Sequence, residues 1–464
     1  MDVSRRRFIR QTACAALGTT SIASTVWNLR AINAAAAQAG GSGTEFRALV
    51  CLFLYGGNDA NNMIVPIDDA TYAGYASARG PIALAQNTLL PLNLVTPDPQ
   101  GRSFGLHPSM PELQSLFNND QKLAIMANVG TLVEPVTAAQ YLKGTAKLPP
   151  QLFSHGDQQV EWQTGWPDGP GTTGWGGRLA DLITSFNSAN AISMSISLAG
   201  SNTFQVGNTV TEYQVSSKGP IGLTGFNGND GQIRYQAVQS LLNLPYQNLF
   251  ETEFAKITNR AITNNGILSS ALSGVTINTA FPANSDLGAQ LQVIAQIIAA
   301  RMTLGMRRQI FFCSVGGYDT HSNELSSQSD LLAELSQCMN AFYQATKELN
   351  IADRVTLFTA SDFGRTFESN GSGADHAWGS HALILGDSVK GGNIYGTYPT
   401  IALGGPDDVG NGRWVPSTSV DEYSATLAKW YGISSPSDLA TVLPNIGRFA
   451  NPDLGFMSQL PPPS

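Results

Sequence analysis

The chain has few charged residues, and the acidic ones outnumber the basic ones. Asp, Glu, Lys and Arg make up 13% of the 464 residues, and the formal net charge is -8. Binding to nucleic acid needs a basic face that neutralises phosphates, so this balance excludes nucleic acid as a partner. A surface poor in charge and rich in Gly, Asn, Ser and Thr is typical of an extracytoplasmic protein.

Cysteine is also scarce, and no C-x-x-C spacing occurs, which excludes a zinc-thiolate site. Cys14 lies in the N-terminal segment, which leaves Cys51, Cys313 and Cys338 in the body of the chain. An odd number cannot pair completely. Because Cys51 and Cys313 sit inside apolar runs, we expect buried free thiols rather than a disulfide.

The first residues carry the pattern of an export signal. A basic stretch with adjacent arginines, Ser4–Ile9, precedes a mildly apolar segment, Thr12–Ile32, and a small-residue run, Ala34–Ala37. This order predicts a cleavable signal peptide, and the paired arginines predict the twin-arginine export machinery as its receptor. The apolar segment is too polar for a membrane span. We therefore expect residues 1–39 to be removed and the mature protein, without a membrane anchor, to be periplasmic or secreted.

Beyond the signal, residues 45–460 alternate between apolar runs typical of strands and amphipathic stretches typical of helices. We expect strands at Ala48–Leu54, Leu123–Val129, Ala191–Leu198, Gln309–Val315, Arg354–Ala360 and His381–Leu385. We expect helices at Met110–Asn118, Trp175–Ile183, Leu287–Met302, Leu331–Leu349 and Leu427–Tyr431. The alternation predicts an α/β domain with a mostly parallel sheet flanked by helices.

The segment from about residue 200 to 285 differs in composition from the rest. It is rich in Asn, Gln, Ser, Thr and Gly, it contains no histidine, and it shows helical patterns at Gln232–Leu242 and Gln247–Ile262. We interpret this segment as a cap region inserted into the α/β domain.

Histidines and aspartates gather in the loops that follow the expected strands. The five histidines, in segments flanked by Gly, Asp or Pro, are His107, His155, His321, His376 and His381. Three aspartates lie just past strand ends, at Asp59, Asp319 and Asp362. Because the carboxyl ends of parallel strands meet at one edge of a sheet, we expect these three carboxylates to lie close together.

Carboxylates and imidazoles at one edge serve as ligands of a divalent metal or as acid–base pairs. Metal explains several carboxylates better, because unpaired carboxylates repel and raise each other's pKa. Simpler roles stay open for three residues: His107 packed on Pro108, His381 in the core, and Asp59 bonded to its own turn. The pair Asp319 and His321, beside two glycines, favours metal binding.

Six motifs resemble the domain-of-unknown-function family numbered 1501. They are Tyr55–Asp59, Leu152–Gln159, Gly174–Arg178, Gly317–His321, Ser361–Arg365 and Asp375–His376. The resemblance runs from Phe46 to Ile433, nearly all of the chain beyond the signal. Members of the family typically carry twin-arginine signals, and its name records no activity. Its fold resembles that of the alkaline phosphatase, sulfatase and phosphoglycerate mutase superfamily.

That superfamily uses two metal sites and a Ser, Thr or modified Cys nucleophile. The resemblance implies a divalent ion (zinc, manganese, calcium or magnesium) with ligands at Asp59, Asp319, His321, Asp362 and His376. The chain departs from the superfamily at Phe363, which stands where a metal-binding histidine belongs. The second metal site has thereby lost a ligand, and is empty, reshaped or completed by His381 or His155.

No nucleophile stands out in the sequence. Ser109 lies near the position that the superfamily implies, and Ser154 precedes His155 in another polar loop. A serine needs a nearby base or metal for activation, and either loop can supply one. Ser109, Ser154 and His155 are therefore the candidate catalytic residues.

An anionic ester is the substrate class that this resemblance implies. Arginine presents a planar fork to phosphate or sulfate, so Arg178 and Arg365 are candidate substrate-binding residues, with His107 beside them. The first functional hypothesis is an exported metal-dependent hydrolase or transferase of phosphate or sulfate esters.

Two other hypotheses compete with it. An exported binding or assembly protein on a degenerate phosphatase-like scaffold is favoured by Phe363 and by the missing nucleophile. Hydrolysis without metal, by Asp157 with His155, ranks last because the chain lacks a G-x-S-x-G nucleophile motif.

The export signal can be tested by changing Arg5 and Arg6 together to Lys. The twin-arginine receptor reads the arginine pair itself, so we expect the variant to accumulate in the cytoplasm while the wild type is exported. Fractionation followed by immunoblotting measures this distribution. A variant exported as well as the wild type would contradict the assignment.

Overall fold

The computed structural model describes residues 46–187, 192–226 and 228–458. The expected signal, residues 1–39, lies outside these ranges, so its assignment stays a prediction. Within them, no helix combines the length and the hydrophobicity needed to cross a membrane.

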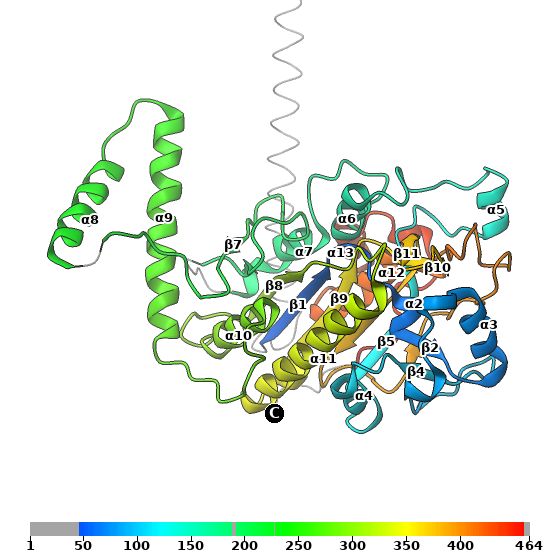
Figure 1. Cartoon of the computed structure of the whole chain (residues 1–464). Helices are drawn as coiled ribbons and strands as arrows, with labels where there is room; N and C mark the ends of the chain where they lie inside the picture. The colour runs from blue at the N-terminus through cyan, green and yellow to red at the C-terminus, as the bar shows by residue number, and fades with distance from the viewer. Residues whose placement is uncertain (1–45, 188–191, 227, 459–464) are drawn as a thin grey trace, which may run out of the picture.

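A nine-stranded sheet forms the centre of the molecule (Figure 1). Its order is β13 (Ile394–Tyr395), β5 (Leu123–Gly130), β12 (Ser380–Leu385), β9 (Val355–Ser361), β1 (Arg47–Leu54), β8 (Arg308–Val315), β6 (Ser195–Ser197) and β7 (Tyr213–Gln214), with β14 (Thr418–Ser419) beside β5. Only β12 runs antiparallel to its neighbours. The central strand β1 pairs in parallel with β8 and β9, so the three strands end at one edge.

Helices cover both faces of the sheet, because alternate residues of β1 face opposite sides. Ala48, Val50 and Leu52 pack in one core with α4 (Pro111–Asn118), α10 (Asp286–Ala299) and α11 (Glu324–Glu348). Leu49, Cys51 and Phe53 pack in the other. That second core includes α6 (His155–Thr164), α7 (Trp175–Ile183), α12 (Val420–Tyr431) and α13 (Pro436–Val442). The predicted α/β class with a mostly parallel, helix-flanked sheet is confirmed.

Smaller elements surround the edge at which β1 ends. The hairpin of β10 (Arg365–Ser369) and β11 (Ala374–His376) follows β9 directly. A three-stranded sheet joins β2 (Ile64–Pro66), β4 (Phe104–Leu106) and β3 (Leu90–Pro91), beside α2 (Ala60–Met63) and α3 (Asp69–Arg79). Helix α5 (Ala138–Leu142) packs in a separate small cluster with Trp378. Short 3-10 turns lie at Gly80–Ile82, Gln86–Thr88, Thr184–Phe186, Ala352–Arg354 and Ile446–Arg448.

The predicted strands at β1, β5, β8, β9 and β12 are confirmed within a residue or two. The strand expected at Ala191–Leu198 is shorter, Ser195–Ser197, and its first residue lies outside the described ranges. Two helix starts were predicted too late. Helix α12 begins at Val420 rather than Leu427, because Ser419 and Glu422 form a capping box that satisfies its first N–H groups. Helix α11 begins at Glu324 rather than Leu331, through a polar first turn without apolar periodicity. The three cysteines of the body are buried and free, as expected.

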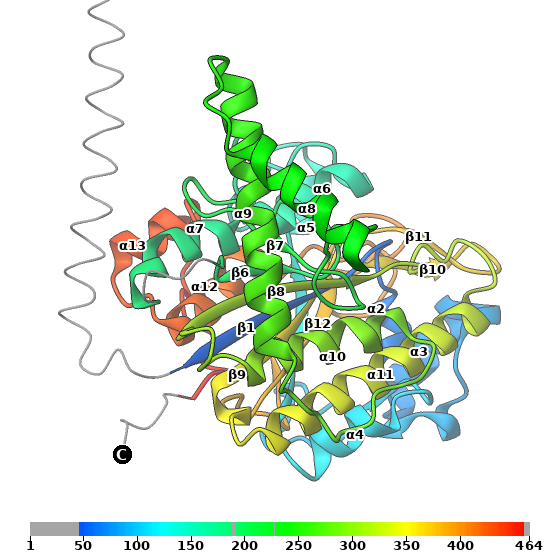
Figure 2. The same ribbon diagram turned by 90° about the vertical axis from the view of Figure 1, so that its left-hand side faces the viewer.

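Helices α8 (Gly228–Leu242) and α9 (Leu249–Leu272) form a hairpin that projects from the body (Figures 1 and 2). Helix α9 borders the body from about Ile257, which lines a pocket with Met194 and Tyr213, to Leu268, which is buried in the core. The hairpin falls inside the segment interpreted as a cap, and a capping role stays a prediction.

A buried ion network holds the β1 loop to α3 and α11. Asp59 accepts the N–H of Asn61 at the start of α2, and its carboxylate also pairs with Arg79. The same Arg79 nitrogen donates to Glu324 at 2.9 Å, and all three side chains are fully buried. Arg79 thus compensates the charge of Asp59, whose pKa is lowered, whereas burial raises the pKa of Glu324 to about 10 and leaves that carboxyl group protonated.

Replacing Arg79 with Ala leaves the Asp59 carboxylate buried without its cation and removes a hydrogen bond to Glu324. We expect a loss of about 3–5 kcal/mol in the free energy of unfolding, measured by urea denaturation. The control is Lys256→Ala, which removes an exposed ion pair with Glu253 and is expected to leave the unfolding midpoint nearly unchanged. An Arg79→Ala protein as stable as this control would contradict the role of the network.

Candidate metal centre

The edge at which β1, β8 and β9 end carries the site. Asp319 lies four residues beyond β8, and Asp362 directly follows β9. The β1 loop passes close to both: a Cβ on Gly56 would meet the Asp319 backbone nitrogen at 2.5 Å, and one on Gly57 would meet the Phe363 ring at 2.6 Å. Both glycines have positive φ, so the approach of the three loops requires them.

His155, the first residue of α6, points into this site. Its Nδ1 lies 2.6 Å from Oδ2 of Asp362, which is fully buried. Gln159, one turn further along the helix, donates to the same oxygen at 2.8 Å. Since an ionised carboxylate only accepts, His155 donates from Nδ1, and in the neutral ring its Nε2 then carries a lone pair.

Two further histidines are oriented in the same way. His376 on β11 has its Nδ1 2.8 Å from the carbonyl oxygen of Phe153, which can only accept. His321 has its Nδ1 3.1 Å from Oδ1 of Asp375, and Asn370 donates to that oxygen. Each ring therefore holds a proton at Nδ1 and, when neutral, presents the lone pair of Nε2.

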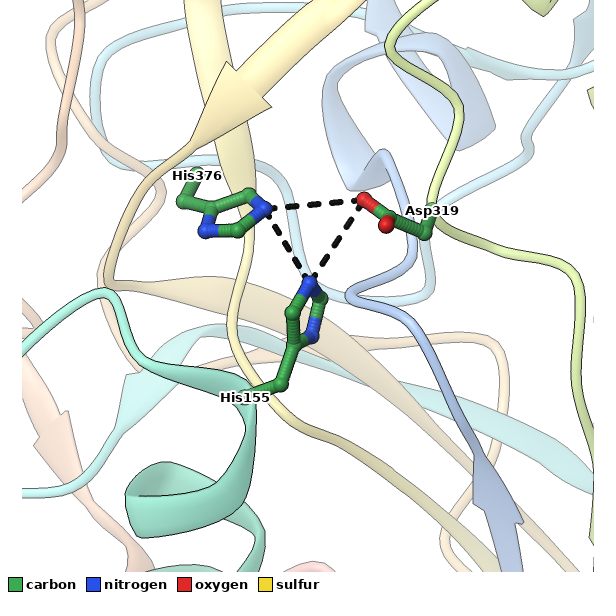
Figure 3. Close-up of side chains that lie close together, drawn as sticks. All are labelled: His155, Asp319 and His376. Carbon is green, nitrogen blue, oxygen red and sulfur yellow. Dashed lines mark hydrogen bonds and ion pairs between the residues drawn. The ribbon is translucent and has the colours of Figure 1, made fainter.

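The three Nε2 atoms converge on Oδ1 of Asp319. Their distances to that oxygen are 3.5 Å for His155, 3.1 Å for His321 and 3.5 Å for His376. The Nε2 of His376 lies 3.1 Å from that of His155 and 2.9 Å from that of His321. Figure 3 shows His155, Asp319 and His376, whose donor atoms all lie within 4.8 Å of one another.

The charges around the cluster keep its acids ionised. Burial raises the pKa of Asp319, but the hydrogen bond and charge of Arg365 outweigh it, and the pKa lies below its usual value. The hydrogen bond from Asn370 likewise lowers the pKa of Asp375. Burial lowers the pKa of His376, which favours the neutral ring. Neutral imidazoles beside carboxylates are the donor set of a divalent metal site.

Phe363 takes part in the site as an apolar wall. It is fully buried, and its ring centroid lies 4.7 Å from those of both His155 and His376. A side chain without a lone pair therefore packs against two of the converging histidines. The aromatic contact fixes their rings and adds no ligand.

Some of the predicted site residues come together and others do not. The structure brings together Asp319, His321, Asp362 and His376 from the expected metal ligands, and adds His155, expected as catalytic. Asp59, the remaining expected ligand, has its carboxylate bound by Arg79 and Asn61. His155 is the histidine that completes the group.

The two candidate anion-binding arginines have their donors bound within the protein. Arg178 is buried and donates to the carbonyl oxygens of Thr164, Thr173 and Val442. Arg365 donates to carbonyl oxygens of the β1 loop and to Ala374, besides Asp319. Substrate binding by either arginine stays a prediction, one that these contacts do not favour.

The candidate serines differ in their partners. Ser154 Oγ donates to Oδ2 of Asp157 at 2.5 Å, beside His155. Ser109 Oγ shares a 2.8 Å hydrogen bond with Ser329 on α11. Only Ser154 has a carboxylate partner, which favours it over Ser109 as a nucleophile.

The residues that sequence reasoning missed are those that orient the rings. Gln159 belongs to the motif Leu152–Gln159, of which Ser154 and His155 were the candidate catalytic residues. The i+4 spacing of Gln159 from His155 places both residues on one helix face. Asn370 and the carbonyl of Phe153 had no signal in the sequence, since a backbone acceptor can come from any residue type.

Comparison with known families finds a match within the second half of the molecule. Residues 232–432 match the family model described as "Protein of unknown function (DUF1501)". The family resemblance is thereby confirmed over this segment, which includes the motifs around Asp319, Asp362 and His376. No curated protein matches the chain.

Several solved structures are similar to the chain in part. An alkaline phosphatase superfamily protein from Vibrio parahaemolyticus has 12% identity and a TM-score of 0.35, covering 85% of this chain and 68% of its own. The PsFucS1 sulfatase from Pseudoalteromonas sp. has 9% identity and a TM-score of 0.31, covering 79% of this chain and 68% of its own. The C-terminal periplasmic domain of EcEptC from Escherichia coli has 13% identity and a TM-score of 0.34, covering 87% of each chain. Identities this low carry no activity over to this chain.

His107 lies in the core rather than among the converging histidines. It is buried, and its Nδ1 accepts the N–H of Ser109 at 3.1 Å. Burial lowers its pKa from 6.5 to about 4. Protonation would break this hydrogen bond and leave a charge in the core, so the folded state resists it.

This pKa predicts a loss of stability in mild acid. The unfolded chain takes up the His107 proton below about pH 6.5 and the folded chain only near pH 4, so stability falls across that window. We expect His107→Gln to remove roughly 2 kcal/mol of the fall between about pH 6.5 and pH 5. Urea denaturation at both pH values measures it, and an unchanged fall would contradict a buried neutral His107.

Proposed function

We propose that the protein is an exported metal-dependent hydrolase of phosphate or sulfate esters. The observation that carries the proposal is the convergence of three imidazole Nε2 atoms on one oxygen of Asp319. The ligands proposed for the metal are His155, His321, His376 and Asp319, with Asp362 orienting His155.

The three Nε2 atoms lie close enough together that a bound cation would stabilise their arrangement. Three neutral rings that donate from Nδ1 carry no proton at Nε2, yet the Nε2 atom of His376 lies only 2.9 Å from that of His321 and 3.1 Å from that of His155. Lone pairs at this spacing repel unless a positive charge lies among them. Arg365 supplies part of that charge, since its Nη1 lies 3.4 Å from the Nε2 of His321.

The ligand types narrow the choice of metal. Nitrogen donors with a carboxylate suit zinc and other late first-row ions, whereas calcium and magnesium prefer a shell of oxygens. A bound ion of this kind would polarise the ester oxygen and lower the pKa of an attacking hydroxyl group.

The residues of the chain would supply the remaining functions. Ser154 is the proposed nucleophile, with Asp157 as the acceptor of its proton, because the two already share a short hydrogen bond next to His155. Phe363 keeps water from one side of the histidine cluster. Export by the twin-arginine route would let the protein bind its metal inside the cell, where metal supply is controlled.

A second candidate is a non-catalytic binding or assembly protein on the same scaffold. Two observations favour it. Phe363 stands against the histidines without offering a ligand, and Asp59 is occupied by Arg79. Both remove groups that a second metal ion would use.

Metal content tests the first proposal directly. Protein purified without chelator is expected to contain about one equivalent of divalent metal by mass spectrometry, and His376→Ala to lose most of it because a ligand is missing. The matched control is His107→Gln, which changes a histidine outside the cluster. Wild-type protein with less than about half an equivalent would contradict the metal site.

Turnover separates the two candidates. Under the hydrolase proposal, metal-loaded protein cleaves an aryl phosphate or an aryl sulfate, and Ser154→Ala abolishes cleavage while metal content stays at the wild-type level. Metal-loaded protein that cleaves neither ester would favour the binding scaffold.

A further inference from the structure

The α8–α9 hairpin exposes more large apolar side chains than any other described part of the molecule. Residues 241–254, around its turn, include Leu241, Leu244, Leu249, Phe250 and Phe254, and we call these five the hairpin patch. Their exposed fractions run from 51% for Leu244 to 83% for Phe250. Figure 1 shows α8 and the adjoining part of α9 projecting to one side of the sheet and its covering helices.

The patch is shaped as a groove rather than scattered over the surface. A groove of about 610 Å³ between the two helices is lined by Val238, Leu241, Tyr246, Phe250 and Phe254. An isolated pair of helices joined by a short turn buries too little apolar surface to be stable on its own. The groove therefore offers a site in which another apolar surface can be buried.

Charge decides which kind of surface fits. Residues 235–256 carry only Glu251, Glu253 and Lys256, and Glu253 already pairs with Lys256 at 2.8 Å. A bilayer surface is bound by apolar residues flanked by clustered Lys and Arg, which this segment lacks. The chain as a whole has a net charge of -8, so a nearly neutral projection is where two copies can meet with least repulsion.

We propose that the hairpin patch binds the hairpin patch of a second copy of this chain. Two helix pairs related by a two-fold axis form a four-helix bundle, in which the same surface serves both partners. Phe250 and Phe254 enter the groove of the other copy and become the buried centre of the contact.

The exposed area matches what such a contact needs. Phe250 and Phe254 are 83% and 69% exposed. If the full apolar surface of each side chain is ~200 Å², the two together expose about 300 Å² of apolar surface. With the three leucines the patch offers on the order of 500–600 Å² of apolar surface. A stable interface of standard size buries ~800 Å² on each partner, of which about 450 Å² is apolar.

Sedimentation velocity of the purified protein over a concentration series tests this contact. The wild type is expected to sediment as a dimer, and Phe250→Ser with Phe254→Ser to weaken dimerisation at least ~100-fold. Both side chains are mostly exposed, so the variant is expected to fold, and circular dichroism checks it. Leu142→Ser, which changes a 67% exposed leucine on α5, is the matched control and should remain dimeric.

Three results would overturn the proposal. They are a wild type that stays monomeric at every concentration, a doubly substituted variant that dimerises as tightly as the wild type, and a Leu142→Ser protein that loses its dimer to the same extent. Pelleting of a monomeric wild type with phosphatidylcholine vesicles, lost in the double variant, would assign the patch to a lipid surface instead.

Discussion

The guanidinium group of Arg365 is the contact on which the site depends. It binds carbonyl oxygens of Gly56 and Gly57 after β1, of Tyr318 after β8 and of Ala374 in the β10–β11 hairpin, besides the Asp319 carboxylate. These bonds join three loops that approach from separate parts of the chain. Because the group is fully buried and permanently charged, it both fixes the loops and keeps Asp319 ionised among the histidines.

The acidic and aromatic residues around the cluster leave its histidines as the converging donors. Arg79 neutralises the aspartate that follows the first strand, and Phe363 places an apolar ring against two of the histidines. His155, which enters from α6, adds an imidazole to the remaining group. The described residues thus concentrate their nitrogen donors at one point instead of dividing ligands between two, which is the arrangement expected for a single ion.

Much of this arrangement could be predicted from the sequence, for a physical reason. Apolar runs that end in Gly-Gly or Asp mark buried parallel strands, and such strands end together, so the meeting of Asp319 with Asp362 followed from the pattern. The partner of Asp59 did not follow, because Arg79 approaches from a helix whose position depends on tertiary packing. The ring-orienting acceptors were equally hidden, since Phe153 contributes only its backbone oxygen.

The pairing of β1 has a consequence for how the protein folds during synthesis. Its two neighbours start at Arg308 and Val355, so the apolar run Ala48–Leu54 has no partner until most of the chain has left the ribosome. Contacts this distant in sequence form slowly, and an unpaired strand invites aggregation in the meantime. A chaperone that shields this run during synthesis would protect the whole sheet, and any chain that ends before Val355 would leave one edge of β1 unpaired.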